Sequence, residues 1–84
     1  MDNDPDEALV ERCRRGERSA LEAIVRQYQK PLYNAAFRVL GNAEDAKETT
    51  QTVFIRVWER IHDFDPQYRF FGWIYRIAVN ESLD

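Results

Sequence analysis

The sequence predicts an all-α fold, a small bundle of three to four helices with a loop before the last helix. Apolar residues recur at helical spacing along the chain, and no segment shows the period-two alternation that is typical of strands. Gly16, Gly41 and the pair Asp65-Pro66 separate the apolar segments. We expect a single domain with a thin core, since a chain of 84 residues buries only about 60 to 65 % of its unfolded surface.

The first helix is expected to begin at Pro5 or Asp6 and to end at Arg15, with Gly16 as its C-terminal stop. The residues before it are acidic and carry no base. We therefore expect residues 1–7 to be a frayed, flexible terminus.

The second helix is expected to begin at Ser19. Glu22 follows three residues later, which is the spacing of a capping box. Apolar residues then continue at helical spacing as far as Gly41, which closes the helix. Pro31 lies inside this pattern and removes one amide donor, so we expect a kink there rather than an end.

The third helix is capped by Asn42, with Glu44 and Asp45 in its first turn, where the helix dipole favours acids. Its apolar positions predict one buried face, made of Ala46, Thr50, Val53, Val57 and Ile61. The pattern fails at Asp65-Pro66, which predicts a loop.

The fourth helix is expected to start near Phe71 or Gly72 and to continue to the last residue, as in a domain excised from a longer chain. One apolar face is predicted to point to the core, formed by Ile74, Ile77 and Ala78. A second stripe is rotated away from it, formed by Trp73, Arg76 and Asn80.

This second stripe has the chemistry of a nucleic-acid strand site: a ring for stacking, a cation for phosphate and an amide for a base edge. The preceding loop adds more rings and a base, at Tyr68, Arg69, Phe70 and Phe71. Stacking contributes about 1 to 3 kcal/mol per base, so two or three contacts could offset the unstacking of a base from a duplex.

The alternative reading is that the rings fill a thin core, and at least half of them are expected to be buried. Phe71, Trp58 and Phe64 are the rings most expected in the core. Arg76 could equally form an ion pair with Glu81 or cover apolar surface with its stem. The residue types alone leave the two readings balanced.

The net charge of −3 divides unevenly along the chain. Residues 1–11 hold five acids and no base, which leaves twelve bases against ten acids, a net charge of +2, for the remainder. A weakly basic body is compatible with modest phosphate contact, but not with DNA binding by charge alone.

Catalytic and metal sites are not indicated by the sequence. His62 is the only histidine, and no cysteine or serine is convincingly placed beside it. Cys13 is the only cysteine, so an intramolecular disulfide is excluded, and its helical position favours a small buried hydrophobe. We expect no enzyme, no cofactor, no metal and no membrane segment, in a reduced cytoplasmic compartment.

Two stretches, "NAEDAKETTQTVFIRVW" and "FFGWIYRIAVN", carry a specific resemblance. The first is similar to the acidic-Gln-x-x-Phe helix, and the second to the Phe-x-x-Trp-Leu-Tyr-Arg-Ile-Ala-x-Asn signature, of bacterial sigma factors of the extracytoplasmic-function (ECF) group. The chain from about Leu9 to Asp84 resembles the second conserved region of these factors, with the spacing between the two stretches preserved. Residues 1–84 are thus expected to be this one domain, without the family's C-terminal domain.

The resemblance implies a domain that docks on the β′ clamp helices of RNA polymerase, then recognises and melts the −10 promoter element by capturing non-template-strand bases. It implies polymerase-binding roles for Gln51, Ile55 and Arg56. It implies a specificity loop at residues 65–71 and DNA-binding roles for Arg56, Phe64, Tyr68, Arg69, Phe70, Trp73, Arg76 and Asn80. A monomer is expected, held inactive by an anti-sigma factor.

Two positions depart from the family pattern. Thr52 stands where Glu is usual, which puts one docking contact in doubt, and Gly72 stands where Thr or Ala is common, which could loosen the fourth helix. The alternative hypothesis is a protein-interaction module that an anti-sigma factor binds and sequesters, without DNA binding of its own.

Overall fold

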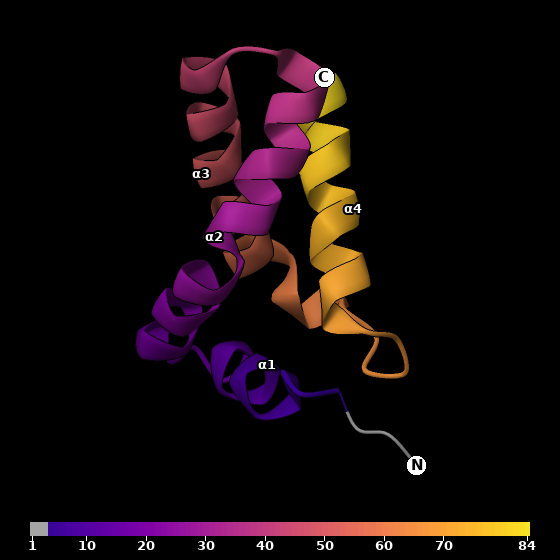
Figure 1. Ribbon diagram of the computed structural model, residues 1–84. Coiled ribbons are helices and arrows are strands. Elements are labelled where there is room, and N and C mark those ends of the chain that lie inside the picture. The colour runs from indigo at the N-terminus through magenta and orange to yellow at the C-terminus, as the bar shows by residue number, and fades with distance from the viewer. Residues whose placement is uncertain (1–3) are drawn as a thin grey trace.

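The computed structural model describes residues 4–84, and these form four α-helices, one short 3-10 helix and no strand, which confirms the all-α prediction. The elements are α1 (Glu7–Arg14), α2 (Arg18–Leu40), α3 (Ala43–Arg60), the 3-10 helix η1 (Ile61–Asp63) and α4 (Phe70–Leu83). Helices α2, α3 and α4 pack against one another, and Figure 1 shows α1 lying across one end of this bundle.

The turn between α1 and α2 differs from the prediction. Helix α2 begins at Arg18, and the capping box predicted at Ser19 and Glu22 is wrong. The hydroxyl of Ser19 instead accepts a hydrogen bond from the guanidinium of Arg12 at 3.1 Å, and Arg12 also donates to Glu17 at 3.0 Å. The hydrogen bond from Arg12 to Glu17, with a second from Arg15, lowers the pKa of the Glu17 carboxyl. A basic side chain of α1 therefore organises the turn, in place of a local cap.

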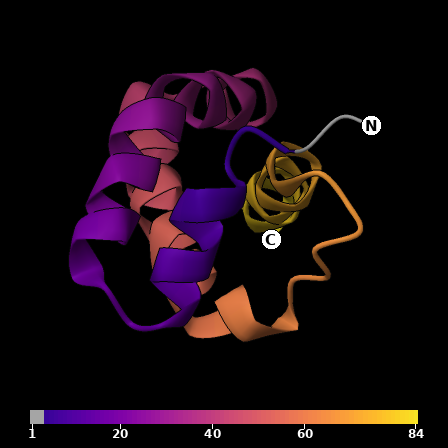
Figure 2. The same ribbon diagram turned by 90° about the horizontal axis from the view of Figure 1, so that it is seen from below.

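Helix α2 continues through Pro31 without interruption, as predicted. Figures 1 and 2 both show that its two halves run in different directions, which is the expected effect of a proline inside a helix. The helix ends at Gly41, whose φ of 67° lies in the left-handed region and whose amide donates to the carbonyl of Phe37 at 2.8 Å.

Helix α3 begins as predicted, since the Asn42 side chain accepts a hydrogen bond from the amide of Asp45 at 2.9 Å. All five residues of its predicted inner face are buried. Thr50, the polar member, donates its hydroxyl to the carbonyl of Ala46 at 2.7 Å, which removes the penalty for burying it.

Helix α4 begins at Phe70, slightly earlier than predicted, and its inner stripe of Ile74, Ile77 and Ala78 is buried as predicted. Phe70 extends this stripe by one turn and is fully buried, while Phe71 remains 43 % exposed. The sequence analysis expected Phe71 in the core and Phe70 at the DNA-binding surface, and the structure shows the reverse. Neighbouring helix residues point about 100° apart, so only one of the two can face the core.

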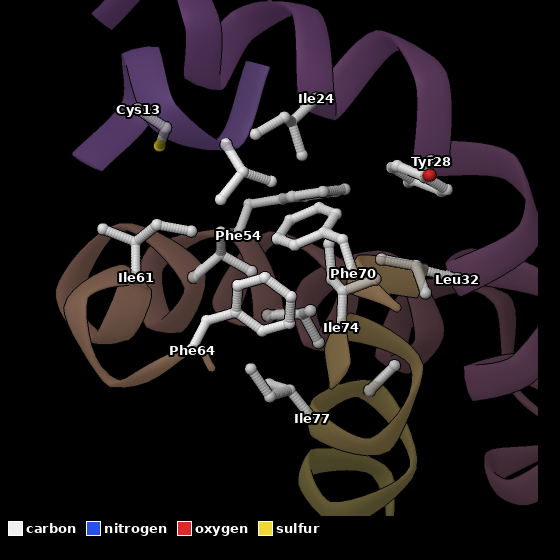
Figure 3. Packing of buried hydrophobic residues seen from close by; sticks show 14 of the residues in the cluster. Cys13, Ile24, Tyr28, Leu32, Phe54, Ile61, Phe64, Phe70, Ile74 and Ile77 are labelled. Atoms are coloured by element: carbon white, nitrogen blue, oxygen red, sulfur yellow. The ribbon is translucent and has the colours of Figure 1, made fainter. Parts of the chain in front are cut away.

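The core brings rings of α2, α4 and the segment after η1 together (Figure 3). The centroid of the Phe70 ring lies 5.6 Å from that of Phe64, edge to face, and 6.0 Å from that of Tyr28. Trp58 is only partly buried against this cluster. Of the six rings from Phe64 to Tyr75, only Phe64 and Phe70 are buried, so the expectation that at least half of the rings would be buried is wrong for this stretch. The two buried rings serve packing, and the other four keep exposed surface.

The prediction of a frayed terminus at residues 1–7 is wrong for residues 4–7, and residues 1–3 lie outside the described part. Asp6 is only 2 % exposed, and it accepts hydrogen bonds from the hydroxyl of Tyr28 and from the side-chain amide of Gln27, the latter at 2.8 Å. Asp4 accepts a hydrogen bond from the backbone amide of Phe70 at 2.6 Å. The acids bind donors on α2 and α4, so this segment is part of the fold.

Candidate nucleic-acid interface

A cleft of about 520 Å³ opens between the loop after η1 and the first two turns of α4. It is lined by Asp63, Phe64, Asp65, Tyr68, Arg69, Gly72, Trp73 and Arg76. Five of the eight residues predicted to bind DNA thus share one hollow, although they are spread over thirteen positions from Phe64 to Arg76. The volume lies within the range of about 300 to 1,000 Å³ that is usual for sites binding small organic groups.

The loop that forms one wall of the cleft is held at its start and along its length. The guanidinium of Arg14, on α1, donates to the carbonyl of Phe64 at 2.8 Å. Asp65 then accepts two hydrogen bonds, from the amide of Gln67 to its side chain at 2.9 Å and from the amide of Tyr68 to its carbonyl at 3.0 Å. This is the turn that an Asx residue before proline favours. The loop is therefore a compact turn with a defined shape.

Trp73 forms the floor of the cleft from α4. Its ring lies 5.3 Å from that of Phe64 and 5.8 Å from that of Phe70, centroid to centroid, so the core rings support it from one side. The side chain is only half-buried, and its remaining surface lines the cleft. Tyr68 faces the cleft from the loop and is 68 % exposed. The cleft thus offers one ring supported by the core and one exposed ring, and both have surface on which a planar group could stack.

The charges around the cleft are mixed. Arg69 and Arg76 are exposed at its wall, and neither takes part in an ion pair within residues 4–84. Asp63 and Asp65 line the same cleft. Asp65 is the first residue of the predicted specificity loop, whereas Asp63 was not assigned to the site. Because the two acids offset the two arginines, the cleft carries little net charge that would attract a phosphate strand.

Three predicted DNA-binding residues lie elsewhere. Phe70 is fully buried, so its ring belongs to the core and is closed to a nucleic-acid strand. Asn80 is exposed two turns further along α4 than Trp73, on the same side of the helix, but it does not line the cleft. Arg56 lies on α3 and donates to Glu81 and Glu59, each at 3.3 Å. These hydrogen bonds, that to Glu81 first, raise the pKa of Arg56.

Phe64 was assigned by the sequence analysis both to the core and to DNA binding. It is 5 % exposed and is packed against Phe70, which confirms its place in the core. The small exposed part nevertheless lines the cleft. It is the neighbour that fixes Trp73, rather than an open stacking platform.

A second surface lies between α2 and α3 and holds two of the three residues predicted to bind polymerase. Gln51 lines a groove of about 340 Å³ there, and Ile55, 55 % exposed, lines an adjoining hollow with Leu21 and Trp58. Arg56 lies on the α4 side of α3 and lines neither hollow.

The groove next to Gln51 also contains three cations that the sequence analysis missed: Arg26, Lys30 and Lys47. Arg26 and Lys30 stand four positions apart on one helix and Lys47 comes from another. Helical spacing indicates the first pair. The approach of Lys47 depends on how α2 and α3 pack and has no local signal.

Metal and membrane features were not found in the described part of the chain. Within residues 4–84, no group of three or more His, Cys, Asp or Glu side chains could hold a metal ion. No helix among them is long and apolar enough to cross a bilayer. Cys13 is buried as predicted, and burial raises the pKa of its thiol.

The sequence and the fold were compared with known proteins. The family model described as sigma-70 region 2 matches residues 24–84. The chain is 35 % identical over 75 residues to the ECF RNA polymerase sigma factor SigW of Bacillus subtilis, a match that covers 89 % of this chain and 40 % of that relative. It is 31 % identical over 82 residues to the RNA polymerase sigma-H factor of Pseudomonas aeruginosa, covering 98 % of this chain and 42 % of the relative.

A solved structure agrees with these matches. It is the NMR structure of the complex formed by an engineered region 2 of sigmaE with GTAAAA, and it aligns with a TM-score of 0.87 at 32 % identity. The alignment covers 93 % of this chain and 81 % of that one. The chain spans about two fifths of the length of the two curated relatives, at 40 % and 42 %.

Proposed function

Because the chain belongs to the sigma-70 region 2 family, we propose that it acts in transcription initiation, as the part of a sigma factor that recognises the −10 promoter element. In this role it docks on RNA polymerase in the cytoplasm and captures non-template-strand bases as the DNA melts. Sigma factors are not enzymes, so the domain catalyses no reaction. It favours melted DNA because it binds the single strand and not the duplex.

The observation that carries the proposal is the half-buried Trp73 at the floor of a 520 Å³ cleft, beside two arginines that form no ion pair within residues 4–84. A base extruded from the stack enters the cleft and stacks on Trp73 or Tyr68. Arg69 and Arg76 then contact the phosphates on either side of that base, and Asn80 contacts the strand further along α4. Stacking of about 1 to 3 kcal/mol per base offsets the few kcal/mol that unstacking costs.

The solved structure of the engineered sigmaE region 2 supports this reading, because it has a similar fold and is a complex with GTAAAA. Residues of the loop wall, rather than the fold, decide which base is preferred here. Asp63 and Asp65 are placed to accept hydrogen bonds from the exocyclic amino groups of a base.

The polymerase contact is proposed at the α2–α3 surface, through Gln51 and Ile55. Exposed apolar surface at Ile55 beside the three cations of the neighbouring groove suits a helical partner that presents apolar and acidic side chains on one face. An anti-sigma factor that covers the same surface would block docking. The domain itself is proposed to be a monomer.

A titration of the 84-residue chain with labelled hexanucleotides tests the proposal. The set contains GTAAAA, variants changed at each position, and the matched duplexes, with fluorescence anisotropy as the readout. We expect tighter binding to single strands than to duplexes, and discrimination of about fivefold or more at one position at least. Equal affinity for every strand would contradict base capture and would favour the module that only binds proteins.

A further inference from the structure

The N-terminus of α4 lacks a local cap, although it follows directly on the loop of the cleft. Arg69 occupies the N-cap position, and its side chain forms no capping hydrogen bond. The first turn of α4 also contains no acid. The first amides of a helix have no partner within the helix, so an acceptor must come from elsewhere.

Asp4 supplies that acceptor from the other end of the chain. The backbone amide of Phe70 donates to one carboxylate oxygen of Asp4 at 2.6 Å, although the two residues are 66 positions apart. The other oxygen accepts a hydrogen bond from the amide of Asp6 at 3.0 Å, and the Asp4 carbonyl accepts one from the amide of Glu7 at 3.0 Å. The carboxylate is therefore oriented by its own segment before it meets α4.

The segment that carries Asp4 is itself anchored in the core. Asp6 is buried between Gln27 and Tyr28 of α2, and the Tyr28 ring packs against Phe70 and Phe71, with centroids 6.0 and 5.6 Å apart. Burial and the hydrogen bond to Asp6 raise the pKa of Tyr28, so the phenol stays protonated as the donor to Asp6. Figure 2 shows the described chain before α1 passing beside the start of α4.

The loop lies between this segment and the proposed site. A second hollow, of about 140 Å³, lies on the side of the loop where α1 begins and is lined by Asp4, Glu7 and Glu11. Tyr68 and Arg69 line both this hollow and the larger cleft. A change in the position of the loop would therefore alter both hollows together.

We propose that Asp4 is a positioning residue for base capture: its carboxylate holds the first amide of α4 and thereby fixes the loop that forms the cleft. This inference rests on the proposed function, since it assigns Asp4 a role in the capture of a base. Asp4 touches no base. It acts through Phe70, which is rigidly buried, and so sets where Tyr68, Arg69 and Trp73 stand.

Two effects of removing the Asp4 carboxylate have opposite signs. Loss of a negative charge near a phosphate-binding surface strengthens DNA binding of any sequence. Loss of the hydrogen bond to Phe70 weakens base-selective binding, because the cleft loses its defined shape. The sign of the change in affinity for the preferred strand therefore separates the two effects.

The test compares Asp4→Ala, Asp4→Asn and Glu7→Gln with the parent chain. Asp4→Ala and Asp4→Asn change the net charge equally, but asparagine keeps an oxygen that can accept the Phe70 amide proton. Glu7 lines the same small hollow, is exposed and forms no side-chain hydrogen bond within residues 4–84, so Glu7→Gln is the charge control. Two readouts are used: hydrogen exchange of the Phe70 amide, and the ratio of affinities for the preferred and a scrambled single strand.

We expect Asp4→Ala to speed exchange of the Phe70 amide about tenfold and to lower the affinity ratio about fivefold, as for the loss of a helix cap. Asp4→Asn should restore most of both, and Glu7→Gln should leave the ratio unchanged. Unchanged Phe70 exchange in Asp4→Ala, or unchanged selectivity, would overturn the inference while the parent chain still selects bases. A parent chain without selectivity would overturn the proposed function instead, and with it the role of Asp4 in capture.

Discussion

Helices α3 and α4 belong to the same bundle, but their N-termini are stabilised in different ways. Helix α3 follows Asn42, whose side chain accepts the amide of Asp45 three residues later. Helix α4 follows Arg69, which provides no cap, and its first amide donates to Asp4 across the fold. The start of α3 therefore depends on its own sequence alone. The start of α4 depends on a segment far away in the sequence.

The outer faces of the two helices differ as well. On α3, Arg56 is paired with Glu59 and Glu81, and its charge is used within the domain. At the start of α4, Arg69 and Arg76 form no ion pair within residues 4–84. Exposed ion pairs of this kind contribute little to stability. Arg56 lies outside the cleft because it faces Glu81 of α4 from α3.

The inner side of α4 gives the largest expected effect. Phe70→Ala removes a fully buried ring and should lower the free energy of unfolding by about 3 to 5 kcal/mol. Chemical denaturation measures this value, and Phe71→Ala is the matched control, since Phe71 is half exposed and should lose much less. A small loss for Phe70→Ala would show that this ring is not in the core and would reopen its assignment to DNA binding.

The outer side of α4 should show the reverse behaviour. Trp73→Ala removes the floor of the cleft and should weaken binding to the preferred single strand by about 1 to 3 kcal/mol. Because Trp73 is half-buried against Phe64 and Phe70, some stability will also be lost, so binding is measured at a temperature where the variant is fully folded. Trp73→Phe keeps a ring and should retain part of the affinity. Equal binding by Trp73→Ala and the parent chain would contradict the proposed site.

The start of α3 should affect stability and leave binding unchanged. Asn42→Ala removes a cap and should lower the free energy of unfolding by about 1 kcal/mol. Affinity for the preferred strand should stay constant, because this helix end is at the opposite end of the bundle from the loop (Figure 1). Asn42→Asp, which keeps an acceptor, should retain the stability. A change in base selectivity on Asn42→Ala would mean that the two helix starts are coupled.

The smallest effect is expected from replacing the glycine in the first turn of α4 with a residue that favours helix. Gly72 lies inside the first turn of α4, and a Cβ there would meet no atom within 4 Å. Gly72→Ala should therefore raise the free energy of unfolding by about 0.5 to 1 kcal/mol, through helix propensity. Thermal unfolding measures the gain. A loss of stability would indicate that the backbone at this position needs the freedom of glycine.

Local signals in the sequence predicted much of the fold. The cap at Asn42, the stop at Gly41, the helix through Pro31 and the inner faces of α3 and α4 all depend on residues within a turn or two of each other. The capping box at Ser19 was wrong because Arg12, on another helix, holds the carboxylate of Glu17 and the hydroxyl of Ser19. A guanidinium that reaches across a turn changes the cap without changing the spacing that predicted it.

The sequence predicted which residues belong to the candidate site, and the structure corrected which of them lie together. Trp73, Arg76 and the loop residues were named from their types, and the structure brings five of the predicted residues to one cleft. Sequence spacing could not decide between Phe70 and Phe71, because a shift of one residue in the start of α4 exchanges which ring points inward. Asp63 was not assigned to the site, so its place in the cleft wall was missed, and Asp65 was named only as the first residue of the specificity loop.

The sequence by itself determined the helices, their order and their buried faces, because hydrophobic periodicity and local caps act between residues a few positions apart. Tertiary structure alone decided which rings stay exposed, which arginines form ion pairs within residues 4–84 and what caps α4. These depend on contacts between segments up to 66 positions apart, as between Asp4 and Phe70, and no local pattern encodes such a contact.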